Sequence, residues 1–416
     1  MTEQPQSESE RRRDGRLGVF GSLCTMVFLV NFARVVFAPL LDPFRLQFGI
    51  TTEGAVGLIA TLAWVGSALP RIPTGYVLTR VPRHRVVGWT GLVLTASAAF
   101  TAAATSLTMV YVGALCMGLA SGAYFIAANP LVSELFPRRV GRAIGVHGMS
   151  SQLAAVAAPS FVGLVLIRDS WAVPLLGQTE AWRVVFVATA AVTAVTTAAF
   201  YVVARRTTMP AAGTEDRDLL SALRRQWKII LTGLAILGAT GFVWNGVFNF
   251  YVRYMTVTKD LSAAQGRTLL TLVFLAGVPA FLLTGDLADR VSHVPLLLAL
   301  LGGFIASLLG LTVVGGFLPL VGVTLVLGYI VHSTFPAMDT FMLDSLPDEN
   351  RASAYALYSG SMMLVQATGS VAVGLLVDAG IGYDAAFRGF AAVLVVVLAG
   401  LVGLFLLDRL PSGAES

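Results

Sequence analysis

The chain has 416 residues, of which 56% are hydrophobic and only 12% are charged. An ordinary soluble domain has roughly 45–50% apolar and about 25% charged residues, so this composition excludes a soluble protein of this size. The formal net charge of +5 comes mainly from arginine clusters between apolar runs. Membrane topology explains such clusters better than nucleic-acid binding does.

Each long apolar run can cross a bilayer as one helix, because a helix satisfies its backbone hydrogen bonds internally. The sequence therefore predicts an all-α, polytopic membrane protein with twelve transmembrane helices, arranged as two pseudo-symmetric six-helix bundles. The first run is too long for a signal peptide, and we expect it to remain as an anchor. The predicted spans are 17–41, 54–79, 85–106, 107–134, 142–167, 183–204, 228–253, 267–289, 294–315, 317–341, 352–378 and 386–408.

The basic residues outside the spans are distributed unequally between the two sides of the membrane. If both termini are cytoplasmic, 19 Lys and Arg residues lie on the cytoplasmic side and 7 on the other side. Cytoplasmic loops carry an excess of Lys and Arg. The sequence thus predicts a multi-pass protein of the cell membrane with both termini in the cytoplasm.

The longest connection divides the chain into two halves. We expect a cytoplasmic tail at 1–16, a six-helix bundle at 17–204, a cytoplasmic loop at 205–227, a second bundle at 228–408 and a cytoplasmic tail at 409–416. The second part of the loop is amphipathic and predicts a helix along the inner membrane surface. A shift of 210 positions aligns several residue pairs of the two halves, such as Thr74-Gly75 with Thr284-Gly285. Such an alignment indicates a duplicated six-helix unit.

The loop between the eighth and ninth spans reads Gly285-Asp-Leu-Ala-Asp289-Arg290. It resembles the G-x-L-A-D-R motif of the major facilitator superfamily, and the resemblance extends over essentially the whole chain. The corresponding first-half loop keeps Gly75 and Arg80 but has Thr79 where the family usually has aspartate. The resemblance implies a secondary transporter with alternating access, not an enzyme. It also implies that a conformational latch is formed by Gly75, Arg80, Gly285, Asp289 and Arg290, unless these residues only determine topology.

The fifth span contains several small residues and a proline, similar to the antiporter motif of the superfamily's drug exporters. These residues are Gly145, Ala154, Ala158, Pro159 and Gly163, and three of that motif's glycines are replaced. Close helix packing explains the small residues equally well. This pattern alone therefore does not decide whether the protein is an antiporter.

Arg34 and Arg71 lie within predicted spans, where a charged side chain is costly and is by default functional. Asn31 shares a helical face with Arg34, and prolines flank Arg71. The carboxylates of the first half lie at helix ends, so a bound anion would be the natural counterion. For Arg71, snorkelling to the cytoplasm or pairing with a helix end is the alternative.

The seventh span places Asn245 and Asn249 on one face, beside the aromatic Trp244 and Phe248. This face predicts a cavity lining, with interhelical hydrogen bonding as the alternative. The remaining uncharged polar residues in spans act more often as packing contacts than as ligands; they are Asn129, Gln152 and Gln366.

The tenth span carries His332, Pro336 and Asp339 on one face. A histidine titrates near neutrality, and burial can raise the pKa of an aspartate toward the same range. This pair is therefore the candidate for proton coupling. Alternatively, Asp339 belongs to the polar loop that follows. The sequence contains no nucleotide-binding loop, metal cluster or nucleophile arrangement, and we expect no cofactor and no metal.

Together these patterns predict a transporter of a small organic or inorganic anion, which engages Arg34 while the amides of the seventh span complete its shell. The first alternative is an exporter of hydrophobic or cationic compounds by proton antiport. The second is a membrane receptor or sensor that binds without transport. We expect the partners to be a small-molecule substrate, a proton or another coupling ion, and membrane lipid, with no nucleic acid, and we expect a functional monomer.

Overall fold

The computed structural model describes residues 4–137, 140–209, 219–288, 290–347 and 351–410. These residues pack as two compact units that are discontinuous in sequence. Unit 1 comprises Met1–Val35, Gly66–Ala155 and Val165–Asp216. Unit 2 comprises Val36–Val65, Val156–Leu164 and Arg217–Ser416. The predicted limits of the two six-helix bundles stay a prediction.

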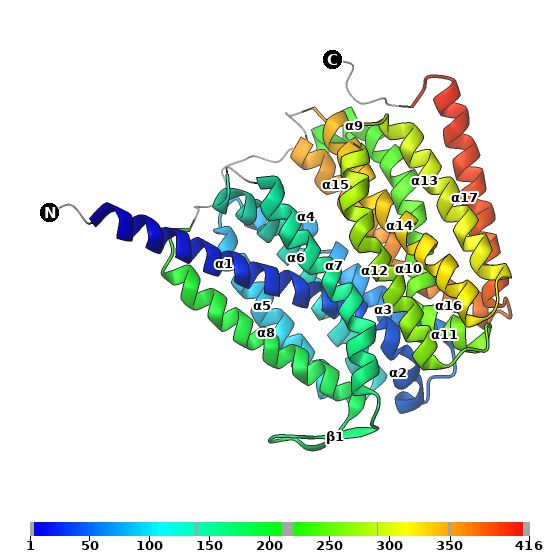
Figure 1. The fold of residues 1–416 in the computed structure, drawn as a ribbon, viewed down its shortest axis with the longest axis horizontal. Helices are drawn as coiled ribbons and strands as arrows, with labels where there is room; N and C mark the ends of the chain where they lie inside the picture. Colours follow the sequence, from blue (N-terminus) through cyan, green and yellow to red (C-terminus); the bar gives the residue numbers. More distant parts are fainter. Residues whose placement is uncertain (1–3, 138–139, 210–218, 289, 348–350, 411–416) are drawn as a thin grey trace. The chain divides into compact units, whose positions relative to one another are not determined.

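Unit 1 is built from long helices and one short hairpin (Figure 1). Helix α5 packs against α6 and α8, and α1 also packs against α6 and α8. The hairpin of β1 and β2 is antiparallel and pairs Ser170 with Glu180. The elements are α1 (Gln4–Val35), α4 (Arg71–Val77), α5 (Arg83–Ala102), α6 (Leu107–Leu135), α7 (Val140–Val165, which continues into unit 2), β1 (Ser170–Val173), β2 (Gly177–Glu180) and α8 (Ala181–Arg205).

Unit 2 contains the remaining helices. Helix α12 packs against α14, α13 against α14 and α17, and α10 against α15 and α16. The elements are a 3₁₀ helix (Ala38–Leu40), α2 (Leu41–Phe48), α3 (Glu53–Ala68, whose residues from Gly66 onward belong to unit 1), α9 (Leu219–Gly233), a π-helical segment (Leu234–Gly238), α10 (Ala239–Asn249), α11 (Tyr251–Val257), α12 (Ala263–Ala288), α13 (His293–Val313), α14 (Phe317–Ser345), α15 (Arg351–Ala367), α16 (Gly369–Asp378) and α17 (Tyr383–Leu406).

Several helix boundaries follow from local sequence. Ser106 caps α6, and its hydroxyl accepts a hydrogen bond from the backbone N–H of Met109. Helix α3 ends at Ala68, and α4 begins at Arg71 after Pro70, because proline lacks the N–H that would continue the ladder. The predicted seventh span is also divided, by a π-helical segment and by a break at Phe250, although it contains no proline.

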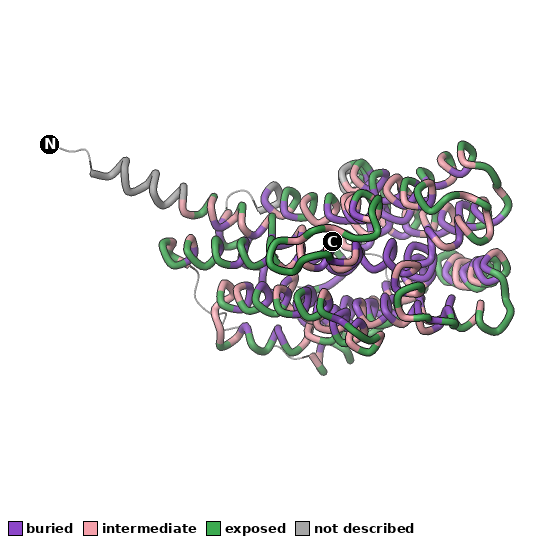
Figure 2. The backbone as a smooth tube through the Cα atoms, turned by 90° about the horizontal axis from the view of Figure 1, so that it is seen from below, coloured by how far each residue is buried: buried purple, intermediate pink, exposed green. Residues whose placement is uncertain are grey.

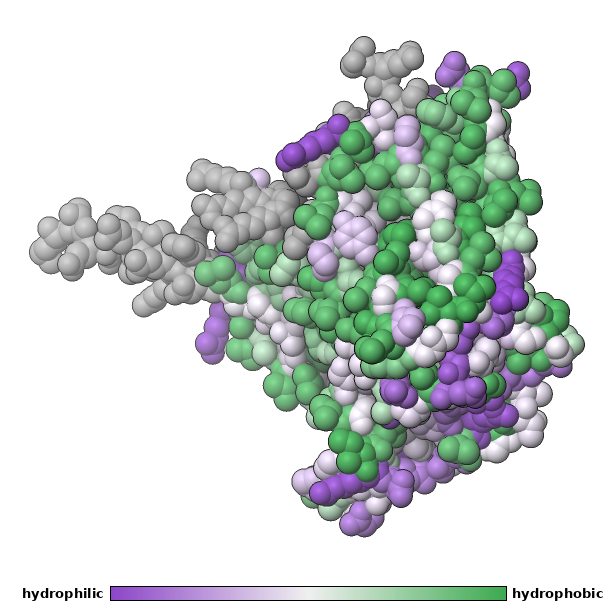
Figure 3. All heavy atoms as spheres, turned by 45° about the vertical axis from the view of Figure 1, so that its right-hand side comes forward, coloured by the Kyte–Doolittle hydropathy of each residue, from purple (hydrophilic) through white to green (hydrophobic). Residues whose placement is uncertain are grey.

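Eleven helices in the described ranges are long and apolar enough to cross a membrane. Helix α5 covers most of the remaining predicted span, 85–106. Buried residues follow the sides of the helices that face their neighbours, and exposed residues follow the other sides (Figure 2). Hydrophobic residues cover much of the face drawn in Figure 3, and hydrophilic residues gather toward one end of it. The hairpin at 170–180 was not among the predicted elements.

The central connection is described only in part. Helix α9 starts at Leu219 and has non-helical dihedral angles at Gln226. Before this kink, Leu220 and Leu223 are exposed, as is Trp227 after it. An interfacial helix in this segment stays a prediction.

Candidate functional site

The two arginines within the spans of unit 1 meet at one serine. Arg34 lies near the end of α1, is 7% exposed, and its Nη1 atom donates to Ser67 Oγ over 3.4 Å. Arg71 is the first residue of α4, and its Nε atom donates to the backbone oxygen of Ser67 over 3.3 Å. Ser67 itself is fully buried. The break between α3 and α4 thus places two guanidinium groups around one buried residue.

Neighbouring helices fix the orientation of Arg34. Its Nη2 atom donates to Asn31 Oδ1 over 2.5 Å, and Asn31 in turn donates to the backbone oxygen of Ser151 on α7 over 2.6 Å. The guanidinium lies 5.1 Å from the ring centre of Phe125 on α6, a geometry that favours cation–π attraction. A charge held by several fixed partners is oriented before any ligand arrives.

A glycine allows α6 to approach this site. A Cβ atom built at Gly122 would lie 2.2 Å from the backbone oxygen of Ser67. Any side chain at this position would therefore push α6 away from Ser67. Phe125 follows Gly122 by three residues and lies on the same face of α6.

The other polar candidates of unit 1 lie on the helices around Arg34. Asn129 on α6 is exposed, and its backbone oxygen accepts from Ser133 Oγ over 3.1 Å. Gln152 on α7 is half-buried and follows Ser151. Their roles as substrate ligands stay a prediction.

In unit 2, the two asparagines of α10 form one buried amide pair. Asn245 is 2% and Asn249 1% exposed, and Asn249 Nδ2 donates to the backbone oxygen and to Oδ1 of Asn245 over 2.8 and 3.1 Å. Ser370 on α16 also donates to Asn245 Oδ1, over 2.9 Å. The Oδ1 atom of Asn249 is buried and has no hydrogen-bond partner within the described ranges. A buried polar atom without a partner calls for an explanation. One explanation is that this atom accepts a hydrogen bond from a bound ligand.

Aromatic rings pack against Trp244 and Phe248, which directly precede the two asparagines on α10. The ring of Trp244 lies 5.5 Å from Phe248, 6.2 Å from Phe274 and 5.9 Å from His332. Trp64 of α3 lies 5.9 Å from Phe248. We call these five rings and the two asparagines the amide–aromatic cluster. It combines flat apolar faces with amide groups, as a site for a planar polar molecule would.

The two proton-coupling candidates have different surroundings. His332 is 4% exposed, and its Nδ1 atom lies 2.7 Å from the backbone oxygen of Gly328 one turn earlier. Asp339 accepts a hydrogen bond from Tyr355 Oη over 2.9 Å. The two residues are seven positions apart on α14, or roughly 10 Å along the axis. His332 thus belongs to the amide–aromatic cluster and Asp339 to the contact between α14 and α15, and a shared proton stays a prediction.

The residues of the predicted latch lie at the ends of α4 and α12. Gly75 is buried in α4, and Arg80 follows that helix in an exposed turn. Gly285 lies on α12, and Arg290 is exposed in the turn after it. Asp289 lies outside the described residues. The function of these residues as a latch stays a prediction.

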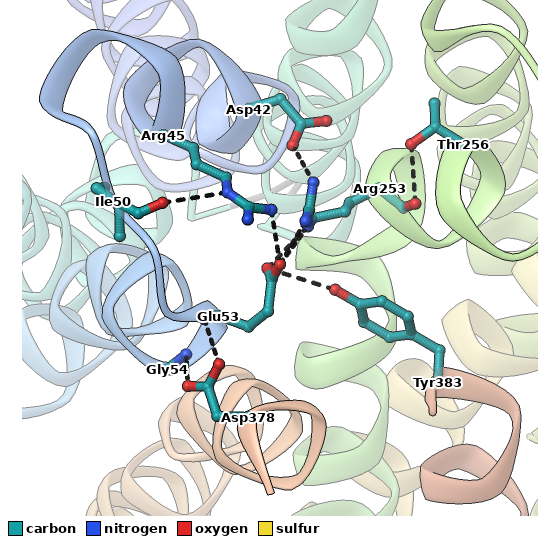
Figure 4. Close-up of polar contacts among 9 residues, drawn as sticks. All are labelled: Asp42, Arg45, Ile50, Glu53, Gly54, Arg253, Thr256, Asp378 and Tyr383. Atoms are coloured by element: carbon teal, nitrogen blue, oxygen red, sulfur yellow. Dashed lines mark hydrogen bonds and ion pairs between the residues drawn. The ribbon is translucent and has the colours of Figure 1, made fainter. Parts of the chain in front are cut away.

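The strongest electrostatic feature of unit 2 is a group of charges that the sequence did not single out (Figure 4). Arg253 of α11 donates through Nε to both carboxylate oxygens of Glu53, each over 2.8 Å, and also through Nη2. Its Nη1 atom donates to Asp42 of α2 over 2.9 Å. Arg45 of α2 donates to Glu53 Oε1 over 2.8 Å. Two carboxylates thus share two guanidinium groups at the ends of α2, α3 and α11.

Two further residues complete this group. Both oxygens of Asp378 accept hydrogen bonds over 2.7 Å from the first backbone N–H groups of α3, at Glu53 and Gly54. An acidic group at a helix N-terminus accepts hydrogen bonds from the backbone N–H groups that have no partner in the helix, and its negative charge interacts favourably with the helix dipole. Tyr383 of α17 donates to Glu53 Oε2 over 3.5 Å. We call Asp42, Arg45, Glu53, Arg253, Asp378 and Tyr383 the Arg253 network.

The Arg253 network joins segments that are far apart in sequence. Its members on α2 and α3 belong to the first half of the chain, whereas those on α11, α16 and α17 belong to the second half. The one signal in the sequence was a set of opposite charges at the ends of predicted spans on the same side of the membrane. This signal is too weak to identify partners that are 200 residues apart.

Comparisons with known proteins agree with this architecture. A model of the Major Facilitator Superfamily matches residues 23–330 and 241–416. A bacterial homologue of the human lysosomal transporter Spinster, solved in an inward-facing and unoccupied conformation, superposes with a TM-score of 0.70 and 17% identity over 97% of this chain and 99% of that chain. A D-xylose-proton symporter superposes with a TM-score of 0.75 and 13% identity, over 92% and 97% of the two chains. At these identities the likeness concerns the fold.

Curated relatives share less of their length. The purine ribonucleoside efflux pump NepI of Escherichia coli O157:H7 is 25% identical over 257 residues, which are 61% of this chain and 59% of the relative. Its counterpart in Salmonella typhimurium strain LT2 is 26% identical over 268 residues, 61% of this chain and 62% of the relative. The chain thus matches about three fifths of the length of these relatives. The predictions of an all-α polytopic membrane fold and of a secondary transporter that is not an enzyme are confirmed, because the chain belongs to the major facilitator superfamily.

Proposed function

We propose that this transporter carries a small organic or inorganic anion and that Arg34 is the group that holds it. The observation behind this proposal is the convergence of Arg34 and Arg71 on the buried Ser67. Two guanidinium groups around one residue inside a membrane-spanning unit concentrate positive charge where charge is most costly. An anion bound there lowers that cost.

The surroundings of Arg34 support a binding role. Asn31 and Ser67 hold two of its nitrogen atoms, and the Phe125 ring lies against its guanidinium. Arginine offers a planar fork of donors that matches a carboxylate or a phosphate, and a lysine does not reproduce it. Arg71 contributes a second charge near the same residue. We expect Arg34 to contact the anion and Arg71 to strengthen its binding through charge.

The test is transport in proteoliposomes with three variants, Arg34→Gln, Arg34→Lys and Arg71→Gln, and with Arg206→Gln as the matched control. Arg206 is exposed at the end of α8. The anion is first identified from a panel of labelled carboxylates and phosphates by its exchange across the membrane. We expect exchange to fall by at least tenfold in Arg34→Gln and in Arg34→Lys, to fall less in Arg71→Gln, and to persist in the control.

Binding measurements separate a transport defect from a folding defect. An anion that binds only the folded protein raises its melting temperature. Arg34→Gln should melt as a single folded species but lose the shift that the anion produces. Undiminished exchange in a folded Arg34→Gln protein would refute the proposal. Binding of the anion without exchange in the unmodified protein would favour the receptor alternative.

The second candidate substrate is a purine ribonucleoside. It is supported by the relatives that are purine ribonucleoside efflux pumps, and by the amide–aromatic cluster of unit 2. A purine base stacks on aromatic rings, and asparagine can form two hydrogen bonds to its edge. The atom Asn249 Oδ1, buried and without a partner in the described ranges, is suited to accept from an exocyclic amine.

The same assays distinguish this candidate from the first. If nucleosides are the substrate, inosine, guanosine or adenosine exchanges across the membrane, Trp244→Ala and Asn249→Leu reduce that exchange, and Arg34→Gln leaves nucleoside binding intact. If an anion is the substrate, Arg34→Gln has the larger effect. A shift in melting temperature with cationic dyes alone would favour the exporter of hydrophobic or cationic compounds.

A further inference from the structure

A groove lies between α5 and α8 of unit 1, away from the residues described above. The two helices run side by side (Figure 1). The groove encloses about 700 Å³. It is lined at one end by His84, Arg85 and Arg205, next to these by Trp89 and Tyr201, and farther along by small or apolar residues such as Leu92 and Ala198. We propose that this groove is a binding site for one anionic phospholipid.

The basic end of the groove has hydrogen-bond donors and positive charges that could bind a ligand. Arg85 and Arg205 are exposed, and neither forms an ion pair with any described residue. The guanidinium of Arg205 lies 4.9 Å from the ring of Tyr201. The Nδ1 atom of His84 is buried and has no hydrogen-bond partner in the described part of the chain. A phosphodiester accepts hydrogen bonds from guanidinium groups and from the N–H group of an imidazole ring. Its chemistry therefore matches all three side chains.

The length of the groove fits one leaflet. It extends along α5 from His84 to Thr95 and along α8 from Ala194 to Arg205. Each of these stretches rises by roughly 16 Å. The hydrocarbon core of a bilayer is about 30 Å thick, so the groove reaches from the interface to about the midplane. A lipid with its headgroup at the arginines would place its acyl chains along the apolar part.

The residues next to the basic end suit the interface between headgroups and acyl chains. Trp89 is 51% and Tyr201 56% exposed. Tryptophan and tyrosine concentrate at the headgroup level of membranes, because one end of each side chain is apolar and the other is polar. Basic pockets between transmembrane helices bind anionic headgroups in the same setting. The basic residues, the aromatic residues and the apolar residues thus lie along the groove in the same order as the headgroup, the interfacial region and the acyl chains of a phospholipid.

Gly88 provides a way to close the groove without changing its charge. It lines the groove on α5, and a Cβ atom built there would have no heavy atom within 4 Å. A leucine at this position therefore projects into the open space, and leucine is a better helix former than glycine. We expect Gly88→Leu to fold normally and to fill part of the groove between its basic end and Trp89.

The test is lipid binding by native mass spectrometry on the full-length protein after delipidation in detergent. Phosphatidylglycerol is compared with phosphatidylcholine that has the same chains. Further arms use glycerophosphoglycerol, which lacks chains, and inorganic phosphate. The variants are Arg85→Gln/Arg205→Gln, Gly88→Leu and the control Arg206→Gln, which removes one charge beside the groove. Each is first checked for a single melting transition without added lipid, and Arg85→Gln alone replaces the double variant if that one does not fold.

We expect the unmodified protein to bind one phosphatidylglycerol at least tenfold more tightly than phosphatidylcholine. The double variant should bind it about 25-fold more weakly, at roughly fivefold for each basic residue at the membrane surface. Gly88→Leu should weaken binding of both lipids, and Arg206→Gln should retain the preference. Equal binding of the two lipids, an equal loss in the control, or unchanged binding in Gly88→Leu would overturn the proposal. Binding of glycerophosphoglycerol or phosphate as tight as that of the lipid would also overturn it, and would indicate a site for a soluble anion.

Discussion

Arg253 connects two carboxylates of the Arg253 network, because it donates to both Glu53 and Asp42. In Arg253→Gln, the carboxylate of Glu53 keeps Arg45 as a partner, whereas the ion pair with Asp42 is lost. The remaining contacts no longer tie α11 to α2 and α3 through charge. On the predicted topology, these helix ends lie on the outer side of the membrane. We therefore expect Arg253→Gln to loosen the packing of α11 against α2 and α3 within unit 2.

The magnitude follows from burial and geometry. The side chains of Arg253 and Glu53 are 16% and 9% exposed, so their charge-assisted contact retains most of its strength. A hydrogen bond to a charged group contributes roughly 1.5–3 kcal/mol. Asp42 is 32% exposed, and a pair this close to solvent adds only about 0–1 kcal/mol. The total loss is about 2 kcal/mol, or roughly a 30-fold change in the equilibrium between packed and separated ends of α11, α2 and α3.

The assay is a distance measurement between two spin labels by double electron–electron resonance. The labels replace Leu46 on α2 and Val257 on α11, which are 85% and 55% exposed. Cys24 and Cys116 are first changed to serine. We expect Arg253→Gln to increase the population with long distances, and Arg253→Lys to give an intermediate result because lysine cannot form the fork that binds both oxygens of Glu53.

A matched control removes an arginine whose ion pair is local. Arg183 donates to Glu180 three residues earlier, over 2.8 Å. Arg183→Gln therefore removes a comparable charge without touching the contact between α11 and α3. Superimposable distance distributions for Arg253→Gln and the unmodified protein would refute the proposed role of the network. An equal shift in Arg183→Gln would show that only net charge matters.

Four further substitutions, one of them a control, test packing, capping and the amide pair. Gly369→Ala should prevent stable folding, since its Cβ atom would lie 1.9 Å from the backbone oxygen of Phe242, whereas Gly145→Ala should be neutral because nothing lies within 4 Å; melting temperature in detergent measures both. Asp378→Asn should lower the free energy of unfolding by about 1 kcal/mol, because it weakens the cap of α3, and an unchanged melting temperature would contradict that role. Asn249→Leu should change stability by less than about 1 kcal/mol, since it also removes a buried polar atom, and a large loss would indicate that the amide is structural.

The positions of the helices could be predicted from the sequence because a membrane requires about twenty apolar residues in each span. Where the chain departs from that rule, the sequence did not predict the breaks within helices or the short strands. The seventh span contains a π-helical segment and a break at Phe250, which depend on packing against neighbours and not on composition. The hairpin of β1 and β2 has only four residues in each strand, too few for an alternating pattern to stand out.

Site residues inside the spans were easier to select than those at helix ends. Arg34 and Arg71 stood out because a charge in an apolar run has a high energetic cost. Their convergence on Ser67 was not predictable, because it depends on the break between α3 and α4 and on the approach of α6 at Gly122. Arg253 was not singled out, because an arginine at a helix end has several explanations and its partners lie elsewhere in the chain.

The predicted orientation leaves seven basic residues on the outer side, and in the structure four of them lie beside carboxylates. Arg45 and Arg253 pair with Glu53, Arg183 with Glu180, and Lys259 lies 3.6 Å from Asp384. A basic residue beside a carboxylate contributes little net charge to its loop once the protein is folded. By contrast, Arg80, Arg85, Arg205 and Arg206 on the predicted inner side are exposed. The two sides therefore differ more in exposed positive charge than in the number of basic residues. A cysteine at position 46 should accordingly react with an impermeant maleimide added to intact cells, whereas one at position 206 should not, and the reverse pattern would invert the predicted topology.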